Sequence, residues 1–305
     1  MIRPHPFALA LILAAAPVFA QEDHNFLSPE EKAGGWKLLF DGRTVPGLRG
    51  LQKPDFLKAG WEIKDGTLNL PKSVRQSGDV TGGDLVTSEQ YGDFEFTFDF
   101  KFVASGAGGI LYFARGGGAK PTGHEYQIID DVHHPDGLKG GPLRRTGALY
   151  SVLPPSEDKR LHESDQWNSG AIKVEGNHVE HWLNGRKVLE YDCGSAALMA
   201  AVRTNKAKVY LGFGQKIKSS LAILDKGEEI AFRDLKIRSL PAPDVAPAAA
   251  LGSPATPTPA TPAPTFFGTP VAPTSTTPSM PAPAATPVPR TWQLPPPPPP
   301  PVIKH

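Results

Sequence analysis

The sequence predicts an all-β fold in which two antiparallel sheets pack as a jelly-roll sandwich, followed by a disordered proline-rich tail. Glycines separate short runs of aromatic and β-branched residues, one run alternates strictly between apolar and polar residues, and two pairs of runs flank hairpin dipeptides. No long segment has the apolar periodicity of a helix, which excludes an alternating α/β fold.

Residues 1–20 have the features of a secretory signal peptide. Arg3 precedes an apolar run over 7–16, and small residues occupy the positions three before and immediately before Gln21. The run is too short for a transmembrane helix. We therefore expect cleavage after Ala20 and export to the periplasm, cell envelope or exterior; the alternative is an uncleaved membrane anchor.

Composition separates one domain from a tail. Residues 241–305 contain 22 of the 34 prolines and only three charged residues, so this segment cannot build a packed core. We expect an extended spacer, partly polyproline II, that contacts the cell envelope. The segment 21–240 holds 29 of the 31 glycines; within it, 21–33 is an N-terminal segment and 34–240 is the predicted sandwich domain.

Charge and cysteine content restrict the partners of the domain. Residues 21–240 carry 29 basic and 30 acidic residues, because Arg3, Arg290, Lys304 and Asp244 lie outside them. This balance argues against nucleic acid as a partner and fits a neutral ligand such as a saccharide. Cys193 is the single cysteine, so the exported fold depends on its core rather than on an internal disulfide.

The clearest strand is predicted over residues 93–102. Phenylalanines at its even positions alternate with polar residues, which indicates one buried and one polar face. Asp65-Gly66 and Asn184-Gly185 suit type I′ turns and predict two hairpins. The paired hairpin strands are 61–64 with 67–70 and 179–183 with 186–191. Further strands are expected at 36–40, 84–88, 109–114, 124–130, 147–152, 170–175, 208–213 and 229–239.

The densest polar stretch lies at 123–136. On a strand, Glu125 and Gln127 share one face, so they face a groove if Tyr126 and Ile128 face the core. A retaining glycosidase needs two carboxyls about 5 Å apart, and the neighbours on this face are Gln127 and Ile129, which disfavours that mechanism.

Two alternatives stay open for the end of this stretch. Asp130 and His133 could bind a divalent cation through oxygen and imidazole ligands. They could equally belong to a polar loop that is capped by its own side chains.

A second polar cluster surrounds His181. Glu180 and Trp182 share one face of the predicted strand and His181 the other, and periodicity does not decide which face meets a groove. Further polar or aromatic candidates lie near predicted strand ends. These candidates for substrate binding are Arg115, Tyr150, Trp167, Asp225 and Lys226.

The motifs in their order resemble the 3-keto-disaccharide hydrolase-like domain over residues 34–239. They include Trp36-Lys37-Leu38-Leu39-Phe40-Asp41-Gly42, Gly83-Asp84-Leu85-Val86-Thr87, Tyr91-Gly92-Asp93-Phe94-Glu95, Glu125-Tyr126-Gln127, Gly147-Ala148-Leu149-Tyr150, Trp167-Asn168, Glu180-His181-Trp182-Leu183-Asn184-Gly185 and Phe232-Arg233-Asp234-Leu235-Lys236-Ile237-Arg238. The resemblance implies a concanavalin-like jelly roll that cleaves glycosides oxidised at C3 of the sugar.

This chemistry requires a base, a group that stabilises an enolate and an acid for the leaving group. We expect Glu125 and His181 to act as base and acid in either order. Gln127, or a cation held by Asp130 and His133, would stabilise the oxyanion. We expect Gln127, Arg115, Tyr150, Trp167, Trp182, Asp225 and Lys226 to bind the substrate.

Two other functions are compatible with the same fold. A non-catalytic carbohydrate-binding module would use Trp167 and Trp182 as stacking surfaces and would bind sugars without turnover. A protein-interaction sandwich that is tethered by its tail would bind no saccharide. The departures from the family pattern, among them Leu224-Asp225-Lys226-Gly227, concern residues that are expected to line the groove.

Overall fold

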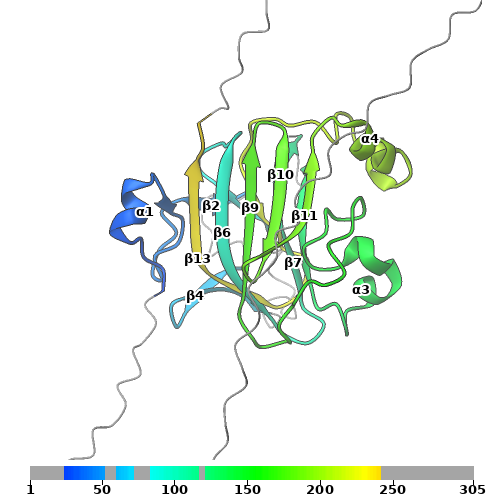
Figure 1. Cartoon of the computed structure of the whole chain (residues 1–305). Helices are drawn as coiled ribbons and strands as arrows, with labels where there is room; N and C mark the ends of the chain where they lie inside the picture. The colour runs from blue at the N-terminus through cyan, green and yellow to red at the C-terminus, as the bar shows by residue number, and fades with distance from the viewer. Residues whose placement is uncertain (1–23, 52–59, 72–82, 117–120, 242–305) are drawn as a thin grey trace, which may run out of the picture. The chain divides into compact units, whose positions relative to one another are not determined.

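The computed structural model describes residues 24–51, 60–71, 83–116 and 121–241. The expected signal peptide and the proline-rich tail beyond Pro241 lie outside these residues. Two antiparallel sheets pack face to face around an aromatic core, as in a concanavalin-like jelly roll (Figure 1), so the predicted fold class is confirmed. Within the described residues, no helix is long and apolar enough to cross a membrane.

The larger sheet has eight strands in the order β11-β10-β9-β6-β13-β4-β3, with β1 paired to β13. Its strands are β1 (Lys37–Leu38), β3 (Glu62–Lys64), β4 (Thr67–Leu70), β6 (Phe94–Phe102), β9 (Asn168–Glu175), β10 (His178–Leu183), β11 (Arg186–Asp192) and β13 (Ile230–Ser239). Neighbouring strands far apart in sequence, such as β6 and β13, show that the sheet closes only when the whole domain has folded.

The smaller sheet has five strands in the order β2-β5-β12-β7-β8. Its strands are β2 (Leu48–Gly50), β5 (Leu85–Thr87), β12 (Ala222–Ile223), β7 (Ala107–Arg115) and β8 (Thr122–Ile129). The helices are short and lie outside the sheets: α1 (Pro29–Ala33), α3 (Pro135–Gly140), α4 (Ala196–Arg203) and two 3-10 turns at Gly141–Arg144 and Lys206–Val209.

The main strand and both hairpins predicted from the sequence are confirmed. The phenylalanines of β6 are all buried, and the residues between them are partly exposed. Positive φ angles at Asp65 and Gly66, and again at Asn184 and Gly185, produce the tight turns that join β3 to β4 and β10 to β11.

The strands predicted at 147–152 and 208–213 are wrong. Gly147 and Ser151 have positive φ angles, which break an extended run, and Leu149 makes only isolated bridges there. The second segment forms a 3-10 turn and a bend in which Leu211 is exposed. Its alternation of apolar residues resembled a strand, but no neighbouring strand pairs with it. The short strands β2 and β12 were not predicted.

Aromatic side chains fill the space between the sheets. The rings of β6 contact one another and the smaller sheet; Phe98, for example, meets Tyr126 of β8 edge to face at 5.4 Å between ring centroids. Rings of this size remove a large apolar area from water, and they account for much of the stability of a domain that lacks disulfides.

A chain of hydrogen bonds crosses this core and joins both sheets. Its two ends fix its direction, because the Gly214 N–H can only donate and the Gly147 carbonyl can only accept. Gly214 N–H donates to His124 Nε2 at 3.1 Å, and His124 Nδ1 to the Tyr191 hydroxyl at 2.7 Å. Tyr191 then donates to Tyr112 at 2.7 Å, Tyr112 to His181 Nε2 at 2.6 Å, and His181 Nδ1 to the Gly147 carbonyl at 2.9 Å.

This arrangement requires both imidazoles to be neutral. Every polar hydrogen in the chain has one acceptor, so an added proton on His124 or His181 would place two donors against each other. Burial lowers the pKa of His181 to about 4 and that of His124 to about 3. Because an unfolded histidine titrates near pH 6.5, the unfolded chain binds more protons below that pH, and acid destabilises the fold.

We therefore expect the free energy of unfolding to fall as the pH falls from about 6.5 to 4.5. The variant His181→Gln keeps an acceptor and a donor but does not titrate, so the slope should be smaller by up to about 1.4 kcal/mol per pH unit. Urea unfolding of both proteins at several pH values measures this slope. An equal slope in both proteins would mean that His181 is charged in the folded state or free to titrate.

Gly170 of β9 permits the close packing of Phe98. A Cβ atom at this position would lie 2.4 Å from the Phe98 ring. We expect Gly170→Ala to destabilise the domain by about 1–3 kcal/mol. Gly92→Ala is the matched control, because a Cβ there has its nearest contact at 3.8 Å. Urea unfolding of the two variants should separate them; equal midpoints would contradict the packing argument.

Candidate active site on the smaller sheet

Two polar side chains of β8 point away from the core on the smaller sheet. Tyr126 and Ile128 are completely buried against the larger sheet, so the alternate residues Glu125 and Gln127 lie on the outer face. The backbone of β8 is also paired beyond its edge, because Tyr150 N–H donates to the Glu125 carbonyl at 3.0 Å. The predicted common face of Glu125 and Gln127 is confirmed.

Lys226 joins these two residues from a distant loop. Its ammonium group contacts the Glu125 carboxylate directly and donates to Gln127 Oε1 at 2.6 Å. The same Nζ atom lies 4.6 Å from the centroid of the Tyr150 ring, a cation–π distance. Four residues predicted separately thus form one cluster, and three of them contact the Lys226 cation.

A glycine at position 109 allows the Glu125 carboxylate to lie close to the backbone of β7. Gly109 of β7 lies opposite Gln127, and a Cβ atom at Gly109 would lie 2.9 Å from Glu125 Oε1. A side chain here would therefore displace the carboxylate. Tyr150 is held on its far side by a hydrogen bond from its hydroxyl to Asp136, at 3.1 Å.

Asp225 shapes the loop that carries Lys226. Its carboxylate accepts the Gly227 N–H at 3.0 Å, and its own N–H donates to Asp84 Oδ1 at 2.9 Å. The predicted substrate-binding residue thus has a clear contact with the backbone of the loop. Its structural contribution is to hold Lys226 between two anchored neighbours.

Asp84 is a functional candidate that the sequence reasoning missed. It precedes the buried strand β5, and burial raises its pKa to about 6, against the opposing field of Lys226. A carboxyl group that is half protonated at about pH 6 can act as an acid under mildly acidic conditions, and raised carboxyl pKa values are common at active sites. The available signal was a lone carboxylate directly before the apolar run Leu85-Val86.

The structure does not bring His181 to this cluster. His181 is completely buried between the sheets, and both of its ring nitrogens are engaged in the hydrogen-bond chain of the core. Its strand β10 belongs to the larger sheet, whereas Glu125 lies on the outer face of the smaller one. The expected pairing of Glu125 with His181 is therefore wrong in its geometry.

Three other predicted binding residues also lie elsewhere. Trp182 is on the outer face of the larger sheet, beside Glu180. Trp167 lies on the same sheet, where Arg233 stacks on its ring at 4.1 Å. Arg115, at the end of β7, donates to the Gln215 carbonyl at 3.0 Å. None of the three contacts the Lys226 cluster in the described part of the chain.

Asp130 and His133 form a capped turn. The Asp130 carboxylate accepts the backbone N–H groups of Ser105, Val132 and His133 at 3.0–3.1 Å, and it contacts His133 Nδ1 at 2.8 Å. These hydrogen bonds lower the pKa of Asp130 although burial opposes them. They use the acceptor sites that a cation would need, so the geometry favours the capped loop over the metal site.

Two other groups of side chains could offer three metal ligands each within the described residues. They are His24 with Asp99 and Asp234, and His178 with Glu180 and Glu190. In the first group, Arg233 contacts Asp99 at 3.2 Å; in the second, Lys187 contacts Glu180 at 3.0 Å. Each group thus has a cationic side chain in place already, and neither lies at the Lys226 cluster.

Comparisons with known proteins agree with this fold. Residues 35–238 match the model of the 3-keto-alpha-glucoside-1,2-lyase-like domain. A 3-keto-disaccharide hydrolase from Bacteroides thetaiotaomicron is 30% identical over 236 residues, which cover 68% of this chain and 79% of the relative.

Two crystal structures of candidate glycosyl hydrolases from Parabacteroides distasonis are also similar. One is 31% identical with a TM-score of 0.63 and covers 72% of this chain and 100% of its own. The other is 25% identical with a TM-score of 0.50 and covers 67% and 99%. The relatives support a glycoside hydrolase-like enzyme that acts on carbohydrate. With two thirds of its length matched by one family model, the chain belongs to the 3-keto-alpha-glucoside-1,2-lyase-like domain family.

Proposed function

We propose that this chain cleaves 3-keto-glycosides by elimination followed by addition of water. The observation that supports this most directly is the Glu125–Lys226–Gln127 cluster, which places a carboxylate, a cation and an amide on one outer face. The activity for which the Bacteroides relative is named supports the substrate class. The features of residues 1–20 support a further part of the proposal, that the enzyme is exported.

The proposed reaction proceeds in two steps, elimination and hydration. A ketone at C3 acidifies the C2 proton, so a base can remove that proton while the electron pair moves to the ketone oxygen. The enolate then re-forms the ketone and expels the substituent at C1, which takes a proton from an acid. Addition of water across the resulting double bond gives the free 3-keto sugar, and the atoms balance.

The cluster provides the first two functions. Glu125 is the base, since its carboxylate is on the outer face and its position is fixed by Lys226. The positive charge of the Lys226 ammonium group stabilises the negative charge that develops on the ketone oxygen. Gln127 is buried, and its Oε1 accepts from Lys226, so it helps to hold the ammonium group toward the same oxygen. Fixed donors of this kind stabilise developing charge effectively, because they need no reorganisation.

Asp84 provides the acid in this proposal. The sequence reasoning gave the second catalytic role to His181, but both nitrogens of that ring are used inside the core. Asp84 lies at the Lys226 loop, and its raised pKa of about 6 keeps part of the population protonated at mildly acidic pH. A protonated carboxyl can donate to the leaving oxygen.

We expect Glu125→Gln to lower kcat on a 3-keto-glucoside by about 10²-fold or more, because the variant cannot accept the C2 proton. It should equally slow the exchange of that proton with deuterium from D₂O, which NMR measures directly. Glu190→Gln, at an exposed position of β11 on the larger sheet, is the matched control and should behave like the wild type. Full activity of Glu125→Gln would sink this role; saccharide binding by the wild type without turnover would instead identify a binding module.

The role of Asp84 predicts a pH profile. Wild-type kcat should fall as the pH rises above about 6, because the acid form of Asp84 disappears, and Asp84→Asn should lack this limb. The variant should cleave a 3-keto-glucoside with an alkyl leaving group about 10²-fold more slowly but be nearly normal with a nitrophenyl group, which needs no proton. If Asp84→Asn is equally impaired with both substrates, the carboxyl group is not the leaving-group acid.

A further inference from the structure

A trough of about 480 Å³ lies on the outer face of the larger sheet, on the opposite side of the sandwich from Glu125. It extends over β10, β9, β6 and β13, which lie side by side in Figure 1. This volume is within the range of pockets that hold small ligands. The trough shares no lining residue with the Lys226 cluster.

The floor of the trough is low because short side chains occupy its centre. One row across the sheet places Trp182 of β10 beside Ala171 of β9, Ala171 beside Thr97 of β6, and Thr97 beside Lys236 of β13. The two small residues thus lie between an indole ring and an ammonium group. The hydroxyl of Thr97 makes no hydrogen bond in the described part of the chain, so it can bond a ligand.

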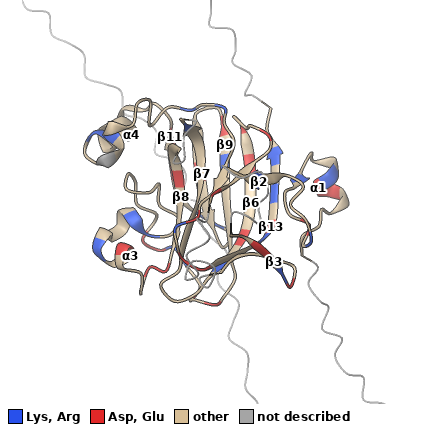
Figure 2. Ribbon diagram, turned by 180° about the vertical axis from the view of Figure 1, so that it is seen from behind, with Lys and Arg blue, Asp and Glu red and all other residues tan. Residues whose placement is uncertain are grey.

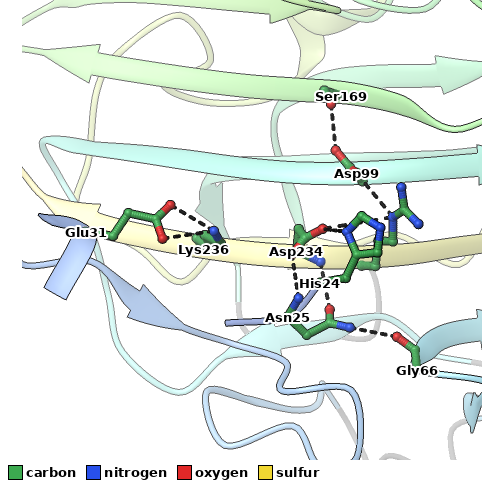
Figure 3. Close-up of polar contacts among 9 residues, drawn as sticks. His24, Asn25, Glu31, Gly66, Asp99, Ser169, Asp234 and Lys236 are labelled. Atoms are coloured by element: carbon green, nitrogen blue, oxygen red, sulfur yellow. Dashed lines mark hydrogen bonds and ion pairs between the residues drawn. The ribbon is translucent and has the colours of Figure 1, made fainter. Parts of the chain in front are cut away.

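Charged groups around the trough are paired with one another. Lys236 contacts Glu31 at 2.8 Å, Arg238 contacts Glu95 at 2.6 Å, and Asp99 accepts from the Ser169 hydroxyl at 2.6 Å. Figure 3 shows the first and last of these contacts together with the N-terminal segment, which His24 and Asn25 attach to Asp234. Figure 2, which views the molecule from the opposite side to Figure 1, shows Lys and Arg as well as Asp and Glu on the ribbons of the sandwich. This balance favours a neutral polar ligand over an ion.

Trp182 differs from Trp167 and Trp36, whose rings are covered by Arg233 and Arg238 of β13. The Trp167 ring is covered by Arg233 at 4.1 Å and approached by Lys101 at 5.3 Å. No such cation covers Trp182 among the described residues. Its Nε1–H donates to Glu180 at 2.9 Å, which holds the indole in place. Trp182 is thus a fixed aromatic surface that lines the trough, whereas the ring of Trp167 is covered by Arg233.

We propose that this trough is a second saccharide-binding site, independent of the reaction at the Lys226 cluster. A pyranose ring presents an apolar face, which stacks on Trp182, and hydroxyl groups at its edge. Those hydroxyls bond to Thr97 and to charged neighbours such as Asp99 and Lys173, whose oxygens and ammonium protons exceed the number of their partners. A binding site of this kind would hold a glycan while the other face acts on it.

The test uses the full chain labelled with 5-fluorotryptophan and followed by ¹⁹F NMR. The resonance of Trp182 is assigned by its absence in Trp182→Phe. The probes are maltotriose, cellotriose, laminaritriose and chitotriose, none of which carries a 3-keto group. We expect at least one of them to shift the Trp182 resonance in a saturable manner, in wild type and in Glu125→Gln alike.

Two variants alter the trough in different ways. Ala171→Gln fills its floor while keeping the indole, and its binding is read from the Trp182 resonance. Trp182→Ala removes both the indole and this resonance, so isothermal titration calorimetry measures its binding beside the wild type. Each variant should weaken binding by about tenfold or more. Trp167→Ala is the matched control and should bind normally, because its ring is already covered. Circular dichroism melting checks that each variant is folded.

Several results would overturn the proposal. One is that no probe shifts the Trp182 resonance. Another is that binding survives Ala171→Gln but is lost in Glu125→Gln, which would place the sugar at the smaller sheet. A third is that a synthetic peptide of residues 255–289 shifts the resonance and the sugars do not, so that the occupant is this chain's own proline-rich segment. Failure of the Glu125 reaction leaves this site unaffected, because the probes are not its substrates.

Discussion

The two sheets of this domain depend on one chain of hydrogen bonds through an otherwise apolar core. Gly214, His124, Tyr191, Tyr112, His181 and Gly147 form it, with alternate members from the two sheets and the loops between them. An unpaired polar group in this space would cost about 1–3 kcal/mol, so the loss of one contact would leave a buried donor or acceptor without a partner. These directional hydrogen bonds fix the position of one sheet against the other. Hydrophobic packing is not directional and fixes this position less precisely.

The two outer faces of the sandwich differ in their polar groups. Among the described residues, His124, His181, Tyr112 and Tyr191 make hydrogen bonds within the core, whereas the polar side chains of the candidate sites lie on the outer faces of the sheets. The smaller sheet presents Glu125, Gln127 and Lys226, a cluster with a cation at its centre. The larger sheet presents a trough with Trp182 at its side and charges that neutralise one another. The first arrangement suits a developing negative charge, and the second suits a neutral polyol.

Several residues of the candidate active site on the smaller sheet could be predicted from the sequence. Glu125 and Gln127 are two residues apart on a strand, so they share a face wherever that strand lies, and the buried Tyr126 and Ile128 show which face it is. Lys226 and Tyr150 were named only as separate candidates, because their segments are distant in sequence and meet through loop geometry. Asp84 was missed, since its raised pKa comes from burial, which a sequence does not state.

The sequence by itself determined the all-β class, the hairpins at Asp65-Gly66 and Asn184-Gly185, and which residues of each strand share a face. These depend on local rules, namely the period of two along a strand and the φ angles that short turns require. The tertiary structure decided that His181 belongs to the core and Trp182 to the opposite side of the sandwich from Glu125. The period of two along a strand shows which side chains share a face, but it does not distinguish the two faces. Only the packing of one sheet on the other decides which face is buried.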